Sequence, residues 1–183
     1  VQSRNSKDPI LPVVAAITVT SHASDAMVAI PFWLEMFAVV AASISGVLVA
    51  REHKLDLVGA VALAVVCGLG GGLLRAMTLQ VGNVYILNQP MALPLSIATA
   101  AIIYIFPAIV DKPDKLIPLL DIISVGIYAA TGADKALVYG FAPVVCIMMG
   151  FFTAVGGGML RDLFAQRIPM IFSGPLYATP CIL

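Results

Sequence analysis

Five long apolar runs constrain the fold of this chain more than any other feature. A helix that crosses the hydrocarbon core of a bilayer needs about 20 apolar residues, whereas the strands of a membrane β-barrel would alternate in polarity. The chain is 61% hydrophobic and 11% charged, and a typical soluble domain is about 45–50% apolar and about 25% charged. We therefore predict an all-α integral membrane protein. The expected spans cover residues 30–50, 57–79, 91–110, 116–137 and 141–164.

The two ends of the chain do not form complete spans. Residues 1–29 combine a polar tail with a short apolar run, and a span there would bury His22 and Asp25. We interpret this segment as an N-terminal extension; a signal peptide, with its charges ahead of an apolar run, is the alternative. A sixth run begins near Tyr177, and the sequence stops inside it. We expect the sixth helix to be completed beyond the given chain.

The basic residues of the loops indicate how the spans are oriented. Arg51 and Lys54 follow the first span, Lys112 and Lys115 follow the third, and Arg167 follows the fifth. The loops after the second and fourth spans carry no Lys or Arg. Because cytoplasmic loops are enriched in these residues, we predict that the basic face is cytoplasmic and that the N-terminus lies outside.

The sequence repeats itself at an offset of 86 residues. The matched pairs include Gly70–Gly72 with Gly156–Gly158, Arg75 with Arg161, and Glu35 with Asp121. This pattern indicates an internal duplication of three spans each. Since three is odd, the second copy enters the membrane from the opposite side, and such inverted repeats are typical of transporters and some channels. The predicted units are a first repeat at 30–110, a cytoplasmic linker at 111–115, and a second repeat at 116–183 with an incomplete third helix.

Glycine and arginine are both costly within a membrane helix, so their presence in both paired motifs indicates a structural or functional role. Glycine lets a helix kink or unwind, which exposes carbonyls to a polar path; alternatively, it permits close helix packing. Arg75 and Arg161 flank the midplane from opposite sides, or else they snorkel to the interfaces. The symmetric pairing of both motifs favours a transport pathway that is lined by the two glycine runs and flanked on each side of the midplane by one of the two arginines.

Three acidic residues are candidates for the same pathway. Asp162 follows Arg161 and can neutralise an arginine. The matching position in the first copy is Ala76, so the two copies are not equivalent. Glu35 and Asp121 are candidates for the pathway mouths; the alternative is that they are interfacial carboxylates.

Asp134 and Lys135, near the end of the fourth span, are the gating candidates. A unit charge that crosses the full membrane field feels about 2.3 kcal/mol per 100 mV. The alternative is that this pair only marks the interfacial end of the span, where lysine snorkels.

The sequence carries no catalytic or metal-binding constellation. The three cysteines show no CxxC spacing, the two histidines lie far apart, and no hydrolase, zinc-protease or nucleotide-binding motif is present. The formal net charge of zero gives no indication of nucleic-acid binding. We therefore expect no enzyme activity, no metal and no cofactor.

The quoted motifs resemble a known group of membrane proteins. "GGGLLRAM" and "GGGMLRDLF" in paired repeats, with "TGADKAL" between them and "YATP" after the second, resemble the prokaryotic members of the trimeric intracellular cation (TRIC) channel family. They resemble equally the related small bacterial family named for glycine transport. The doubled motif does not separate the two.

The resemblance implies seven helices, a homotrimer embedded in membrane lipid, and a location in a bacterial inner membrane. It also implies one pore per subunit for monovalent cations such as potassium, lined by the glycine-kinked second and fifth helices, with Lys135 tied to gating. A passive potassium-permeable channel is thus our leading hypothesis. A secondary transporter for glycine or a similar zwitterion is the alternative, since arginine suits a carboxylate, and a structural scaffold is a third possibility.

Overall fold

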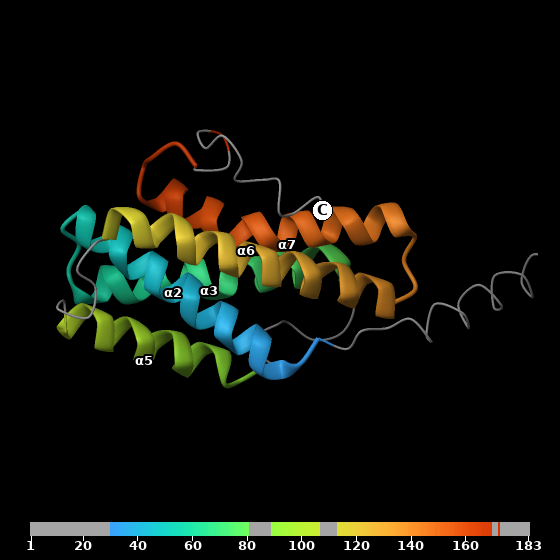
Figure 1. Ribbon diagram of the computed structural model, residues 1–183, viewed down its shortest axis with the longest axis horizontal. Coiled ribbons are helices and arrows are strands. Elements are labelled where there is room, and N and C mark those ends of the chain that lie inside the picture. Colours follow the sequence, from blue (N-terminus) through green and yellow to red (C-terminus); the bar gives the residue numbers. More distant parts are fainter. Residues whose placement is uncertain (1–29, 81–88, 107–112, 170–171, 173–183) are drawn as a thin grey trace, which may run out of the picture.

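The computed structural model describes residues 30–80, 89–106, 113–169 and 172 (Figure 1). Within these residues the chain is helical, as the apolar runs predict, and four of the helices are long and apolar enough to cross a membrane. The N-terminal extension and the start of the sixth run lie outside the described residues. The helices are α2 Phe32–Glu52, α3 Leu57–Leu79, α5 Ala92–Ile105, α6 Pro113–Val138 and α7 Pro143–Phe164.

The third helix is shorter than the span expected over 91–110. α5 has 14 residues and ends at Ile105, and the backbone leaves the helical region at Phe106, where φ is −110° and ψ is 73°. Proline is the next residue in the sequence, and proline disfavours the helical conformation in the residue before it. Residues 107–110 lie outside the described part of the chain.

The helices form a bundle in which each runs antiparallel to the one before it along the chain. In Figure 1, α2 runs from right to left, and α6, which packs against it, runs from left to right. α3 and α7 likewise pack together and run in opposite directions. α5 covers α2 and α3 on one side of the bundle.

The 86-residue offset recurs in the backbone conformation. α3 and α7 begin at positions related by this offset, and α2 and α6 end at positions related by it. Lys54 and Gly140 adopt left-handed φ values of 55° and 75° in equivalent interhelical turns, and Gln80 and Gln166 have φ of 50° and 54° just after α3 and α7. The two turns and the two helix ends are thus built alike, although glycine, which the left-handed conformation favours, is present in only one of them.

The triple-glycine motifs lie where α3 and α7 cross. A Cβ atom added to Gly71 would lie 2.1 Å from the carbonyl oxygen of Thr153, and one added to Gly157 would lie 2.2 Å from that of Cys67. Both motifs are helical throughout, so the unwound backbone considered from the sequence is not found. Glycine here permits close approach of two helices, as small residues do in membrane bundles.

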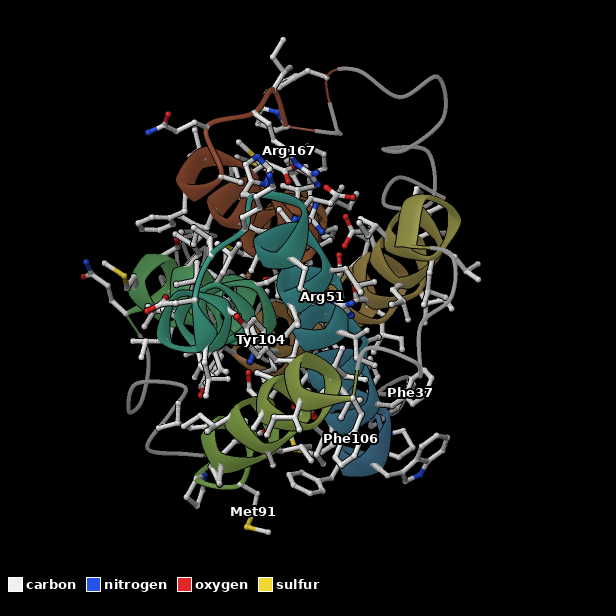
Figure 2. The ribbon with its side chains drawn as sticks, turned by 90° about the vertical axis from the view of Figure 1, so that its left-hand side faces the viewer. Phe37, Arg51, Met91, Tyr104, Phe106 and Arg167 are labelled. Carbon is white, nitrogen blue, oxygen red and sulfur yellow. The ribbon has the colours of Figure 1, made fainter. Side chains whose placement is uncertain are left out.

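α2 is the most enclosed helix, and it carries polar groups into the centre of the bundle. Glu35, Ser43 and Ser45 are all buried. By contrast, large apolar side chains such as Phe37, Met91 and Phe106 are exposed on the outside (Figure 2). An apolar exterior around a partly polar interior suits a protein surrounded by lipid.

Candidate functional site

Two groups of charged and polar side chains, most of them buried, lie inside the bundle. Burying a charge is costly unless it is paired and hydrogen-bonded, so such groups mark a site that the fold is built to hold. We call them the α7 cluster and the α3 cluster. The α7 cluster contains Ser45, Asp121, Arg161 and Asp162; the α3 cluster contains Glu35, Arg75, Gln89 and Lys135.

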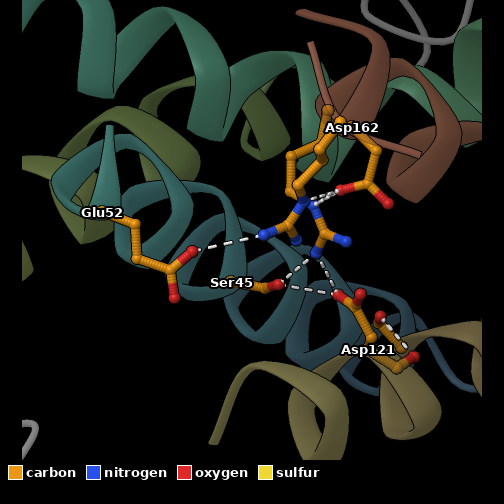
Figure 3. Close-up of polar contacts among 7 residues, drawn as sticks. Ser45, Glu52, Asp121 and Asp162 are labelled. Atoms are coloured by element: carbon orange, nitrogen blue, oxygen red, sulfur yellow. Dashed lines mark hydrogen bonds and ion pairs between the residues drawn. The ribbon is translucent and has the colours of Figure 1, made fainter. Parts of the chain in front are cut away.

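The α7 cluster is centred on the fully buried guanidinium of Arg161 (Figure 3). Its Nη1 donates to Asp121 Oδ1 at 2.6 Å, and its Nε donates to Asp162 Oδ1 at 2.9 Å. Nη1 also donates to Ser45 Oγ, and that hydroxyl donates in turn to Asp121 Oδ1 at 2.7 Å. One arginine therefore joins α2, α6 and α7, and two carboxylates neutralise it.

The α7 cluster continues to the end of the bundle through Arg167. The Nε of Arg167 donates to Asp162 Oδ1 at 2.8 Å, and its Nη1 donates to Glu52 Oε2 at 3.2 Å. Figure 3 shows this chain of ion pairs reaching Glu52, at the end of α2. Asp162 thus accepts from two arginines, one buried and one partly exposed.

The α3 cluster is centred on a carboxylate instead. Glu35 Oε1 lies 3.4 Å from Arg75 Nη2 and 3.9 Å from Lys135 Nζ. Its other oxygen, Oε2, accepts from Gln89 Nε2 at 2.6 Å. Glu35 therefore holds together α2, α3 and α6, and its negative charge faces two cations.

The two clusters are related by the repeat, but their charges differ. Glu35 pairs with Arg75 as Asp121 pairs with Arg161, and each pair is related by the offset of 86. Asp162 has no acidic equivalent in the first copy, and Lys135 adds a cation to the α3 cluster. The described side chains of the α3 cluster sum to one positive charge, whereas Asp121, Arg161 and Asp162 sum to one negative charge.

The structure brings most of the predicted site residues together. Glu35 and Asp121 are 5% and 2% exposed, so both are buried partners of the arginines; their place at the pathway mouths stays a prediction. Lys135 joins the α3 cluster through its contact with Glu35, and the carboxylate of Asp134, its neighbour in the chain, interacts electrostatically with Lys135. The glycine motifs lie at the α3–α7 crossing, where they position the helices that carry the arginines. Their role in a pathway stays a prediction.

Sequence reasoning missed several polar residues of the interior, and three of them make contacts that matter for the site. Ser45 bridges Asp121 and Arg161, Gln89 binds Glu35, and Tyr128 donates to the Gly68 carbonyl oxygen at 2.6 Å. Tyr128 lies seven residues from both Asp121 and Lys135, so its position on one face of the fourth span was a usable signal. No pattern in the sequence predicts the partners of Ser45 and Gln89.

The outer ion pair of this site should contribute little to stability. The Arg167 and Glu52 side chains are 25% and 34% exposed, and exposed pairs are worth about 0–1 kcal/mol. We expect Glu52→Gln to lower the free energy of unfolding by no more than that amount, as measured by denaturant unfolding in detergent micelles. A loss several times larger would show that the chain of ion pairs acts as one unit down to its exposed end.

A family model matches most of the chain. The model described as glycine transporter matches residues 32–108 and 118–183. The UPF0126 inner membrane protein YadS of Escherichia coli K12 is 34% identical to the chain over 156 residues, which cover 83% of this chain and 74% of that relative.

Solved structures with the same fold carry a different description. A TRIC trimeric intracellular cation channel orthologue from Rhodobacter sphaeroides has a TM-score of 0.78 and 32% identity, and the match covers 82% of this chain and 78% of that chain. A prokaryotic TRIC channel, whose crystal structure was determined in 0.5 M KCl, has a TM-score of 0.77 and 27% identity with the same coverage. The chain is therefore similar to both groups that the doubled glycine motif resembles, the family named for glycine transport and the TRIC channels.

Proposed function

This chain belongs to the glycine transporter family of membrane proteins, and from that premise we propose that it is a channel for monovalent cations. The proposal is supported by its likeness, at 32% and 27% identity, to solved structures named as cation channels. Potassium is the cation we propose. Since those relatives are named as trimeric, we also propose a homotrimer embedded in lipid, with one pathway in each subunit.

We propose that the pathway runs from the α3 cluster past the α3–α7 crossing to the α7 cluster. The observation that carries this proposal is the pairing of both buried arginines with carboxylates: Arg75 with Glu35, and Arg161 with Asp121 and Asp162. An arginine without a carboxylate beside it would repel a cation. When the arginine is paired, its charge is offset, and the carboxylate oxygens of its partner can coordinate the cation. Gly70–Gly72 and Gly156–Gly158 would set the width of the pathway by bringing the two helices together.

We propose an inverted repeat whose α7 cluster faces the cytoplasm. The opposite directions of α2 and α6 and the equivalent ion pairs support the inversion. Arg167 pairs with Glu52, the residue that follows Arg51, so both arginines lie at the same end of the bundle, and basic residues are enriched on the cytoplasmic side. The pathway would then open to the outside near Glu35 and to the cytoplasm near Asp162.

The description of the family model keeps a glycine transporter as the second candidate. A transporter would need a cation for the glycine carboxylate, and the obvious candidates are Arg75 and Arg161. Both are already engaged by carboxylates of the chain itself, so glycine would have to displace an internal partner. This observation favours the channel.

Flux through proteoliposomes that contain the purified protein separates the two functions. We expect potassium efflux that does not depend on glycine and does not saturate at low concentration. Glycine uptake that saturates, with no potassium leak, would contradict the channel and make the arginines candidate substrate ligands. Protein-free liposomes and heat-denatured protein are the controls.

The balance of charge in the α3 cluster should control the potassium flux. Glu35→Gln leaves Arg75 and Lys135 without their shared carboxylate, so the cluster becomes strongly positive. We expect the flux per folded protein to fall by about tenfold, at the lower end of what electrostatic focusing contributes to on-rates. Glu52→Gln makes the same change on the same helix at its partly exposed end and should leave the flux close to that of the wild type. Equal effects of the two variants would contradict the proposed route.

A further inference from the structure

One face of α6 carries polar side chains along its whole length. Asp121, Ser124, Tyr128, Thr131 and Lys135 follow one another at spacings of three and four residues, so they lie on one side of a helix. The first four are buried. A membrane helix that buries a continuous polar face must direct it toward other protein groups or toward a water-filled path.

Three of these side chains, seven residues apart, contact three different helices. Asp121 binds Arg161 on α7, Tyr128 donates to the Gly68 carbonyl on α3 at 2.6 Å, and Lys135 lies 3.9 Å from Glu35 on α2. Tyr128 therefore makes a polar contact between α6 and α3 at a position along α6 midway between Asp121 of the α7 cluster and Lys135 of the α3 cluster.

The ring of Tyr128 belongs to a buried cluster of mostly apolar side chains. The Tyr128 side chain is 3% exposed, and the cluster includes Val39, Leu69 and Ala154. These residues come from α2, α3 and α7, so the cluster joins Tyr128 on α6 to three other helices. A hydrated cation that travels between the two charged clusters would meet this apolar section, and apolar constrictions close pores by excluding water.

The hydroxyl of Tyr128 also donates a hydrogen bond to the Gly68 carbonyl oxygen, an atom that could otherwise coordinate a cation. A carbonyl oxygen has two acceptor sites, and within a helix one of them takes the N–H four residues on. The Tyr128 hydroxyl takes the other at Gly68. There is no space for a side chain at this point, since a Cβ on Gly68 would lie 2.6 Å from Ser43 Oγ.

We propose that Tyr128 is the constriction residue of the pathway: its ring closes the section between the two charged clusters, and its bond to the Gly68 carbonyl holds it there. This inference rests on the proposed channel function. Conduction would require the ring to move aside, which breaks that bond and frees the Gly68 carbonyl oxygen for a dehydrating cation.

Tyr128→Phe tests the bond, because it removes the hydroxyl and keeps the ring. In planar-bilayer recordings we expect the open probability to rise by about 2- to 10-fold, which is what the net loss of one hydrogen bond predicts, while the unitary conductance stays the same. Tyr104→Phe is the matched control, because Tyr104 also donates to a backbone carbonyl, that of Leu55 at 3.2 Å, but at an exposed site. An open probability that is unchanged in Tyr128→Phe would overturn the role of the bond.

Tyr128→Ala tests the ring. We expect the permeability to a large organic cation, N-methyl-D-glucamine, to rise relative to that of potassium, because the narrowest section is widened. An unchanged permeability ratio in protein that elutes as folded would overturn the constriction. If the wild-type protein passes no cation at all, the proposed function itself fails; if the wild type conducts and both Tyr128 variants match it, only this inference is overturned.

Discussion

Replacing Gly71 by alanine is expected to destabilise the bundle strongly at the α3–α7 crossing. The new Cβ would lie 2.1 Å from the carbonyl oxygen of Thr153, and a backbone oxygen cannot rotate away as a side chain can. Overpacking of a core costs about 1–3 kcal/mol and sometimes more, and a clash with backbone lies at the upper end. Gly157→Ala should have the same effect, because its Cβ would meet the Cys67 carbonyl oxygen at 2.2 Å.

Gly126→Ala is the matched control for this prediction. Gly126 lies inside α6, and a Cβ there meets nothing within 4 Å. In a helix interior alanine is favoured over glycine by about 1 kcal/mol, so this variant should be at least as stable as the wild type. We would measure the monodisperse fraction in detergent by size-exclusion chromatography and the thermal midpoint. A Gly71→Ala protein that matches the Gly126→Ala protein in both would show that α3 and α7 do not cross as closely as we describe.

Arg161→Gln is expected to be the most destabilising change among the charged residues. It leaves the buried carboxylate of Asp121 with Ser45 as its hydrogen-bond partner and removes one of the two arginines that Asp162 accepts from. Removing one partner of a buried ion pair costs about 3–5 kcal/mol, because the remaining charge is left uncompensated. Arg161→Lys should rescue little of this loss, since an ammonium group cannot reproduce the fork that binds both carboxylates.

Two further variants distinguish this explanation from a general loss of packing. The double variant Arg161→Gln with Asp121→Asn should recover part of the lost free energy of unfolding, because it removes the uncompensated carboxylate. Arg75→Gln, the equivalent change in the first copy, should cost less than Arg161→Gln, because the Arg75–Glu35 contact is longer, at 3.4 Å, and Lys135 also faces Glu35. Denaturant unfolding in micelles measures all three. A double variant that is no more stable than Arg161→Gln would contradict the ion-pair explanation.

The features of the fold that depend on local sequence could be predicted. Hydrophobic length places α3 at 57–79, as the structure has it, and α7 within 141–164. The offset of 86 residues relates Arg75 to Arg161, and these arginines prove to sit in equivalent ion pairs. Such patterns are visible because they depend on composition and periodicity alone.

The partners of the buried groups could not be predicted, because they come from distant parts of the chain. Ser45 meets Arg161 across 116 positions, and Gln89 meets Glu35 across 54. The same lack of tertiary information left open whether the glycines unwind α3 or bring it close to α7, and the structure favours close approach. Whether a carboxylate such as Asp121 lies at an interface or in the interior is likewise decided by packing.

The measurement that tests the central claim most directly is single-channel recording of the purified wild-type protein in a planar bilayer under a gradient of potassium chloride. We expect unitary current steps, linear in voltage apart from gating, whose reversal potential lies close to the potassium equilibrium potential and does not respond to glycine. A reversal potential near that of chloride, or currents that arise only when glycine is present, would contradict the assignment of a cation channel.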